Sequence, residues 1–553
     1  MGHRLVSLIA TVVAGLVLLA IGVEAATRLG PILFTPPHDL AGELDLVSDC
    51  SRILGVSLSL VVSLCALAIP LTANVYTPKL IEIFVSDRLN RACVGFYVLA
   101  NVLVLWNLFV LYDDPPTTAR IRIFVCLVVT LVGLAGIGPY IVYVLRFLVP
   151  RSIVRQLEQE VSDDLAWACG SRKGDDEAVA QARLEALENI KYLGNIALRS
   201  VDRYDRDTAF EALRALRGVF DAYQARKDLL PPEWFRLREA EVLGLGPELG
   251  REVERKRAAI EVAVLQELAL VLPLAIARIP EVVATIAGLT RRFGCRTMER
   301  RDLGSREMVT LFFNTFLRVA LQHRSSDAFY KFVYQYRRFA EEALDPDPTH
   351  ATRVAFFLDY YGHQASRMGL GFLINVVAYD LAALCELAWR KGSPCKDVLL
   401  GMVLRLDRDE AGLMEMPGVV KAQVILAAKL RTRGEEQAAL RIVDELRKVP
   451  REKLAEDFGQ IVEAHEENFW EIADRRRHLD HVEPEFRPAV DALRTDLLGP
   501  RAHVGERTQR FLAASKPVEA PPRPAPPTER FHGRPELPTV PEPDSRRAPD
   551  ELA

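Results

Sequence analysis

The sequence has few cysteines, and none falls in a recognisable pattern. Its eight cysteines include no Cys-x-x-Cys pair and no spacing typical of a metal site. Cys65, Cys93 and Cys126 lie in apolar runs, where a cysteine usually acts as a small hydrophobic side chain. Cys50 lies in a predicted external loop and has no evident disulfide partner. We therefore predict neither a disulfide framework nor a zinc site.

Excess charge and catalytic motifs are also missing. The 70 basic and 74 acidic residues leave a formal net charge of −4, whereas a nucleic-acid-binding surface normally shows a basic excess. The sequence contains no phosphate-binding glycine loop and no nucleophile elbow. We therefore expect no nucleic-acid partner, no cofactor and no enzymatic activity.

Charge is absent above all from four apolar stretches near the N-terminus. At about 1.5 Å per residue, each can cross the ~30 Å hydrocarbon layer of a membrane. The four predicted spans are Leu5–Val23, Ile53–Val75, Ala92–Leu111 and Ile123–Leu145. The first is also compatible with a cleaved signal peptide, but its apolar run is longer than the usual ~7–15 residues, so we predict a retained span. The acidic segment Ala25–Ser51 is predicted to be a loop.

Small and polar residues inside the spans are candidates for helix packing or for lining a pore. Gly55, Ser59 and Ser63 repeat every four residues in the second span. The later spans add Asn101, Asn107, Gly133, Gly136 and Gly138. No span holds an ionisable residue at mid-depth, as proton- or cation-coupled transporters usually do. Hydrogen bonds between helices would satisfy the two asparagines.

Basic residues beside the spans favour one orientation. Seven lie on the side of the N-terminus and four on the other side, so the positive-inside rule places both termini in the cytoplasm. The arginine- and alanine-rich composition suits a bacterium with a high GC content. We therefore predict a multi-pass protein of the bacterial inner (plasma) membrane.

A charged segment joins the second and third spans and is typical of an interfacial helix. Its motif residues are Thr77, Pro78, Lys79, Phe84, Asp87, Arg88, Asn90 and Gly95. This pattern resembles the predicted bacterial membrane proteins grouped as domain of unknown function 2254. A second patch is similar to the cytoplasmic motif of that family and includes Arg199, Ser200, Asp205 and Asp207.

The resemblance covers about the first 220 residues and implies a membrane protein without assigning an activity. The family typically has a Ser-Pro-Gly-Ile-Asn-Asp-Pro run where this chain has Ser-Val-Asp-Arg-Tyr-Asp-Arg-Asp at residues 200–207. Asp202, Asp205 and Asp207 could bind a cation there, but capping of the following helix is the simpler explanation. Thr208 with Glu211 fits a capping box at that helix start.

From Pro150 onward, amphipathic patterns predict one helix after another with short turns. We expect an all-α fold: four transmembrane helices (residues 1–150), a solenoid-like cytoplasmic domain (151–515) and a disordered Pro-rich tail (516–553). Named expectations in the cytoplasmic part are a helix at Glu252–Leu272, a buried core helix at Val262–Leu289, a tetratricopeptide-like (TPR-like) hairpin at Val419–Pro450 and a charged helical end at Arg451–Leu498. In the tail, Pro521–Pro524 could dock an aromatic groove, although a solvated tail is the simpler expectation.

Other tempting residues have simpler explanations. His465 and the segment His478–His481 lack the partners of a zinc-protease helix and are predicted to be exposed helix surface. Helical spacing predicts that Phe329, Phe332, Tyr336 and Phe339 form core, with Tyr330 and Tyr334 facing elsewhere.

Two functions remain open. The first is a multi-pass membrane protein, held by the lipid bilayer, whose cytoplasmic helical domain is a platform for homo-oligomerisation or for a cytoplasmic protein partner. The alternative is an oligomeric ion channel with a cytoplasmic assembly domain, since a channel needs no buried charge.

Overall fold

The computed structural model describes residues 40–75, 81, 84–85, 87–111, 116–147, 149–171, 175–237, 246–406, 417–464 and 478–499. Within these ranges every element of secondary structure is helical, so the all-α prediction is confirmed. The first predicted span, the Pro-rich tail, Thr77, Pro78, Lys79 and His465 lie outside the described residues.

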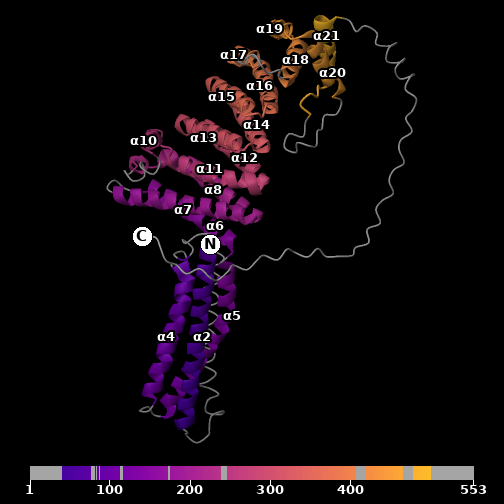
Figure 1. The fold of residues 1–553 in the computed structure, drawn as a ribbon. Coiled ribbons are helices and arrows are strands. Elements are labelled where there is room, and N and C mark those ends of the chain that lie inside the picture. Colours follow the sequence, from indigo (N-terminus) through magenta and orange to yellow (C-terminus); the bar gives the residue numbers. More distant parts are fainter. Residues whose placement is uncertain are drawn as a thin grey trace, which may run out of the picture. The chain divides into compact units, whose positions relative to one another are not determined.

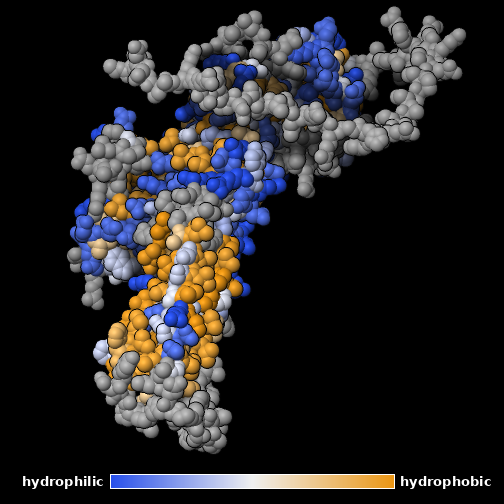
Figure 2. All heavy atoms as spheres, turned by 60° about the horizontal axis from the view of Figure 1, so that its bottom comes forward, coloured by the Kyte–Doolittle hydropathy of each residue, from blue (hydrophilic) through white to orange (hydrophobic). Residues whose placement is uncertain are grey.

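Three long helices correspond to the second, third and fourth predicted spans. They are α2 (Leu40–Val75), α4 (Arg88–Val110) and α5 (Pro116–Phe147), and each packs against the other two. Their surface is apolar: only 17–22% of the residues in their most hydrophobic windows are buried. Figure 2 shows this bundle as a largely hydrophobic surface. Side chains of this kind exposed over such a length are stable in lipid and not in water.

The N-terminal end of α2 corrects one prediction. The helix begins at Leu40, so the second half of the predicted loop Ala25–Ser51 is helical. The reason is a buried stripe that continues from the span into the acidic segment, with Val47, Cys50 and Leu54 at helical spacing. Acidic side chains lie on the other faces, where Asp49 pairs with Arg52 at 3.2 Å. The buried stripe, and not the position of the charges, sets the start of the helix.

The rest of the chain as far as Leu498 is a stack of helices that belongs to the same compact unit as the spans. Its helices are α6 (Pro150–Cys169), α7 (Asp176–Asp202), α8 (Arg206–Arg226), η1 (Lys227–Leu229), η2 (Pro232–Phe235), α10 (Pro247–Arg255), α11 (Ala259–Arg278), α12 (Pro280–Glu299), α13 (Leu303–Gln322), α14 (Ser326–Ala343), α15 (Pro348–Arg367), α16 (Phe372–Lys391), α17 (Lys396–Val403), α18 (Pro417–Thr432), α19 (Glu436–Leu446), α20 (Arg451–Glu463) and α21 (Arg487–Leu498).

The stack has two layers, which Figure 1 shows side by side. In one layer α11, α13, α15 and α17 pack on one another in order, and in the other layer α8, α12, α14, α16 and α18 do the same. Consecutive helices alternate between the layers, so each pair forms a helical hairpin. This arrangement is the repeated stacking of a solenoid, as the sequence predicted.

Two helices of the stack are long and apolar enough to cross a membrane, namely α11 and α16. In contrast to the three spans, 61% of the residues in each of their apolar windows are buried among other helices. Each also buries a carboxylate, Glu261 in α11 and Asp380 in α16. Both therefore lie in the core of the stack, as predicted for the apolar region around α11.

Several predicted boundaries within the stack are wrong. The predicted core helix Val262–Leu289 is two helices: α11 ends at Arg278, and Pro280 takes the first position of α12, where a proline is well tolerated. The predicted helix Glu252–Leu272 is interrupted at Arg257, which adopts a left-handed conformation with φ of 52°. The predicted helical end Arg451–Leu498 contains α20 and α21, with non-helical residues 478–486 between them. The hairpin at Val419–Pro450 is present as α18 and α19, joined through Gly434 at φ of 79°.

The aromatic core lies around α13 and α14. Phe313 stacks on Tyr336 with ring centroids 4.5 Å apart, and Phe329 and Phe332 are fully buried, as predicted. Tyr330 was predicted to face away from the core, but it is buried. The reason is that α14 contacts α12, α13, α15 and α16, so little of its circumference remains exposed.

Candidate functional site

The first motif of the sequence forms a cluster of hydrogen bonds where α4 and α5 meet. Asp87 is the N-cap of α4, and its Oδ2 accepts from the backbone amides of Leu89 and Asn90, both at 2.9 Å. The hydroxyl of Tyr143 on α5 donates to the same oxygen at 2.6 Å. Asp87 therefore caps one helix and ties it to the next, which stabilises the end of the bundle.

Asn90 connects this hydrogen-bond cluster to α5 and, through Tyr140, to α2. Its Oδ1 accepts from the hydroxyl of Tyr140 at 2.6 Å, and its Nδ2 donates to the carbonyl oxygen of Phe84 at 3.2 Å. The Tyr140 hydroxyl also lies 3.1 Å from Cys65 Sγ on α2. Three motif residues, Phe84, Asp87 and Asn90, thus converge in space, whereas Arg88 is exposed and nothing lies near the Cα hydrogens of Gly95.

The candidate packing or pore residues are distributed over different surfaces. Gly133 is buried, and a Cβ there would lie 2.9 Å from Leu54 of α2, so it permits close contact between α2 and α5. Gly136 lies beside the Tyr97 hydroxyl, whereas Gly138 has open space around it. Gly55 faces Asn101, and Ser59 and Ser63 are exposed on the outer surface of the bundle.

The two asparagines of α4 behave differently. Asn107 Oδ1 accepts from Arg122 of α5 at 3.1 Å, which is the bond between helices that the sequence suggested. Asn101 instead donates to the carbonyl oxygen of Tyr97 in its own helix at 2.8 Å. A single asparagine can satisfy its amide within one turn of a helix, so its presence in a span does not require a partner helix.

The second motif forms the turn between α7 and α8. Asp205 is the N-cap of α8, and its Oδ1 accepts from the amide of Thr208 at 3.1 Å. Asp207 lies in the first turn of α8, and Arg199 lies in the last turn of α7. Each charge is opposite in sign to the nearby pole of its helix dipole, which is favourable. Ser200 is fully buried, and its Oγ has no hydrogen-bond partner among the described residues.

Arg278 of α11 holds this turn in place. It pairs with Asp202 Oδ1 at 3.0 Å and lies over the ring of Tyr204, 5.4 Å from the ring centroid. Tyr204 adopts a left-handed backbone conformation with φ of 60°, which is unfavourable for a residue with a side chain. The contacts with Arg278 offset that cost. Of the three aspartates, only Asp205 caps α8, whereas Asp202 pairs with Arg278 and Asp207 lies in the first turn of the helix. Capping therefore explains one of them, and the cap is Asp205 and not Thr208.

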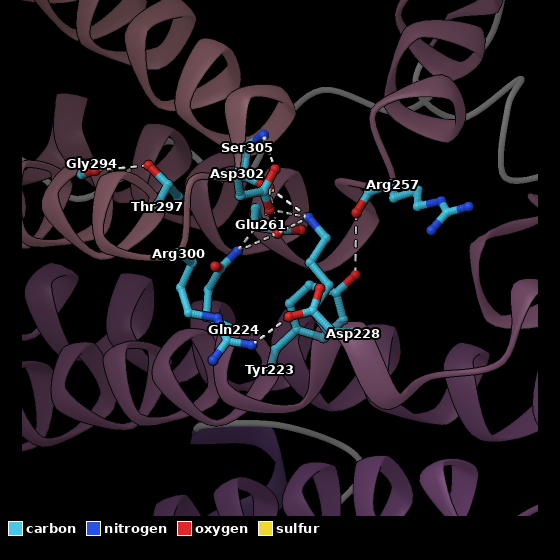
Figure 3. A network of polar contacts seen from close by, with 11 residues as sticks. Tyr223, Gln224, Asp228, Arg257, Glu261, Gly294, Thr297, Arg300, Asp302 and Ser305 are labelled. Carbon is cyan, nitrogen blue, oxygen red and sulfur yellow. Dashed lines mark hydrogen bonds and ion pairs between the residues drawn. The ribbon is translucent and has the colours of Figure 1, made fainter. Parts of the chain in front are cut away.

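A buried ionic network lies deeper in the stack and was not predicted (Figure 3). Lys227 Nζ lies 2.7 Å from Glu261 Oε1, 2.6 Å from Asp302 Oδ2 and 2.7 Å from Ser305 Oγ. Gln224 donates to the same Glu261 oxygen at 2.7 Å. The network joins α8 and η1 to α11 and α13. Each member is an ordinary residue type in a helical pattern, so only packing reveals it.

The charges in this network support one another. Burial lowers the pKa of Lys227, but Glu261 and Asp302 outweigh it and leave that pKa above its ordinary value. Burial raises the pKa of Asp302, but Lys227 and hydrogen bonds from Ser305 bring it below its ordinary value. The lysine is therefore fixed as a cation, and it offers neither a nucleophile nor a base.

The histidine segment near the C-terminal end is not a helix surface. His478 and His481 lie in a half-buried turn, in contrast to the prediction. The carboxylate of Asp480 between them binds Lys421 of α18 at 2.7 Å and accepts from Tyr379 of α16. These contacts pull the segment onto the stack. Within the described ranges, no group of three or more His, Cys, Asp or Glu side chains is arranged to hold a metal ion.

Comparisons with known proteins agree with the membrane assignment. A family model described as "Predicted membrane protein (DUF2254)" matches residues 4–216. A search of the curated proteins finds no match. Among solved structures, the chain is similar to a "Circular tandem repeat protein with novel repeat topology and enhanced subunit contact surfaces", with 15% identity, a TM-score of 0.31, and coverage of 83% of this chain and 97% of that one. At that score the likeness carries no argument about function.

The family match and the three apolar helices together place this protein in a membrane. The matched region includes the bundle and both motif clusters, and it ends within α8. Residues 4–216 are thus similar to the DUF2254 family of predicted membrane proteins.

Proposed function

We propose that this protein is a membrane-anchored scaffold whose helical stack binds a protein partner, either a second copy of the chain or a different protein. The division of the chain follows: residues 1–150 anchor it, residues 151–515 form the platform and residues 516–553 are a solvated tail. We also propose that the stack lies in the cytoplasm of a bacterium, since Arg88, Arg91 and Arg146 lie at the end of the bundle that adjoins α6. The proposal assigns the chain no catalytic activity.

One observation supports the scaffold most directly. Most large apolar side chains exposed on helices of the stack lie in the layer of α11, α13, α15 and α17 or on the adjoining α19. They are Leu270, Leu303, Leu311, Phe356, Tyr360, Val398 and Leu440. In the described parts of the other layer, Phe372 at the start of α16 is the one such side chain. An apolar surface repeated on one layer of a solenoid is typical of a binding face.

The centre of this apolar face is α15. Phe356 and Tyr360 are one turn apart and are 55% and 48% exposed. Aromatic side chains bury large areas and frequently dominate the energetics of protein interfaces. We therefore expect these two residues to contribute most to partner binding.

The test uses the full-length protein purified in detergent. Phe356→Ser combined with Tyr360→Ser should abolish self-association in light scattering, or the recovery of a specific partner from solubilised membranes. Leu229→Ser is the matched control, because Leu229 is equally exposed but lies in η1, outside this layer. A wild-type protein that neither associates with itself nor retains a partner would contradict the scaffold.

The second candidate is an oligomeric ion channel, and the exposed Ser59 and Ser63 favour it. The described bundle interior is filled by apolar side chains such as Leu54, Val61 and Val104, so a water path would have to form between subunits. Ser59→Leu with Ser63→Leu should then block the conductance of the reconstituted protein in planar bilayers. No conductance from a pure, monodisperse wild-type oligomer would dispose of this candidate.

A further inference from the structure

A group of arginines surrounds one carboxylate at the point where the chain leaves the membrane. Glu211 of α8 lies 3.1 Å from Arg151 and 3.5 Å from Arg155, both on α6, and 2.6 Å from Arg214 on its own helix. The three arginine side chains are 60–64% exposed, whereas that of Glu211 is only 12% exposed. Three positive charges against one negative charge leave a local excess of two.

The next turn of each helix does not cancel this excess. Glu158 on α6 lies beside Gly218 of α8, and its electrostatic neighbours are Glu211, Arg217 and Arg155. Arg217 also pairs with Asp221 at 3.9 Å, and Asp221 has Arg292 and Arg296 of α12 as further neighbours. The carboxylates of this turn therefore have arginines of their own. The pKa of Glu211 is below its usual value, chiefly because Arg151 donates a hydrogen bond to it. Glu211 is therefore ionised, and it holds the guanidinium groups together without neutralising them.

The surroundings of these arginines match the interface between lipid and water. The span α5 ends at Phe147, and Arg151 follows four residues later in the first turn of α6. Leu145, near the end of α5, and Val149, just before α6, are exposed apolar residues. Val149, the N-cap of α6, supplies no side-chain cap, so the positive end of the helix dipole also faces this region.

We propose that Arg151, Arg155 and Arg214, gathered on Glu211, bind the phosphate of an anionic membrane lipid. Guanidinium groups bind phosphate oxygens in a bidentate geometry, and each exposed arginine here has N–H groups that Glu211 does not use. The apolar residues beside them contact the acyl region of the same lipid. A role in folding alone does not explain three arginines, because a single cation would already compensate the one carboxylate that is largely buried here.

The experiment uses the full-length protein in a non-ionic detergent and measures bound lipid by native mass spectrometry. The probes are dioleoyl phosphatidylglycerol, dioleoyl phosphatidylcholine and inorganic phosphate. We expect phosphatidylglycerol to bind in preference to phosphatidylcholine. Arg151→Gln with Arg155→Gln should weaken the binding of phosphatidylglycerol about tenfold or more, since each arginine near an anionic surface contributes substantially, and should leave that of phosphatidylcholine unchanged.

The matched control is Arg447→Gln. Arg447, the C-cap of α19, is equally exposed and pairs with the Asp444 carboxylate at 2.8 Å, but it lies far along the chain from the spans. The Arg447→Gln variant should bind phosphatidylglycerol as tightly as the wild type does. Equal binding of the two lipids, or an unchanged affinity in the double variant with its thermal midpoint intact, would overturn the proposal. Displacement of phosphatidylglycerol by millimolar inorganic phosphate would overturn the assignment to a lipid and indicate a site for soluble phosphate.

Discussion

Single polar side chains in this protein act mainly by joining helices. Lys227 is the clearest case, because its ammonium group satisfies two carboxylates on two other helices, one of them fully buried. Buried charges of this kind are stable only while all partners are present, because removal of one leaves another without compensation. Asp87 does the same at the end of the bundle, where one carboxylate oxygen serves a helix cap and a tyrosine.

Lys227→Met should destabilise the stack by about 3 kcal/mol or more, because Glu261 and Asp302 would remain buried without a cation. The thermal midpoint of the full-length protein in detergent measures this effect. Lys448→Met is the control, since Lys448 lies exposed just after α19 and pairs with the nearby Glu445 at 2.8 Å. A network that does not contribute to stability would give the same midpoint for both variants.

Asp87→Ala should lower the thermal midpoint more than Tyr143→Phe. The first change leaves two backbone amides and a tyrosine hydroxyl without their acceptor, whereas the second removes one donor. The double variant should be no less stable than Asp87→Ala alone, because the two residues share one interaction. Additive effects would show that they act independently. Asp49→Ala, at an exposed ion pair of α2, is the control.

Pairs of helices approach closely where one of them has a glycine. A Cβ at Gly133 of α5 would meet Leu54 of α2, and a Cβ at Gly194 of α7 would meet the Glu267 side chain of α11. The space left by each glycine is filled by a side chain from the facing helix. These contacts therefore determine which faces of the helices pack together.

Gly133→Leu should destabilise the bundle in detergent, because the new side chain would occupy the space of Leu54. Gly138→Leu in the same helix should have little effect, since nothing lies within 4 Å of a Cβ there. Comparison of the two thermal midpoints tests whether the close approach is real. Similar losses in both variants would indicate a general cost of replacing glycine in α5.

Stability at the α7–α11 contact should depend on pH through Glu267. Burial raises the pKa of Glu267 from an ordinary value of 4.5 to about 7. The neutral form is thus favoured in the folded state, and its contribution is present below about pH 4.5 and is lost as the pH rises through about 7. Glu267→Gln should remove this loss and stabilise the protein at pH 8 by on the order of 2 kcal/mol. The difference between the thermal midpoints at pH 5 and pH 8 measures this effect. The control is Glu299→Gln at an exposed carboxylate, which should show the same pH dependence as the wild type.

Across the whole molecule, apolar helices lie in two different environments, the membrane and the core of the helical stack. Five described helices are apolar enough to span a membrane, but two of them are covered by neighbours in the stack. Hydropathy alone does not separate these groups. Buried carboxylates and covering helices do, because an uncompensated charge in lipid is far more costly than one paired in a protein core.

Labelling with a membrane-impermeant maleimide tests this division. Leu270→Cys in the middle of α11 is exposed in the stack and should react on the same side of the membrane as Arg447→Cys. Leu99→Cys in the middle of α4 should be protected from both sides. Labelling of the wild-type protein gives the background reaction of its native cysteines. Protection of Leu270→Cys would show that α11 spans the membrane.

The sequence by itself determined the three described spans and the class of fold. Uncharged runs of sufficient length have no stable alternative to lipid, and helical spacing of apolar residues does not require knowledge of the partner helix. It also predicted that the aspartate loop caps the helix that follows, because capping is a local interaction, although the cap is Asp205 and not the predicted Thr208. The first motif was identified from sequence, although its partners Tyr140 and Tyr143 were not.

Only the tertiary structure decided which distant residues meet. Lys227 and Glu261, Arg278 and Tyr204, and Arg151 and Glu211 are far apart in the chain, and their residue types are common on any helix surface. The burial of Tyr330 likewise depends on neighbouring helices. Spacing along one helix fixes which face a side chain lies on, but the order of stacking fixes what covers that face.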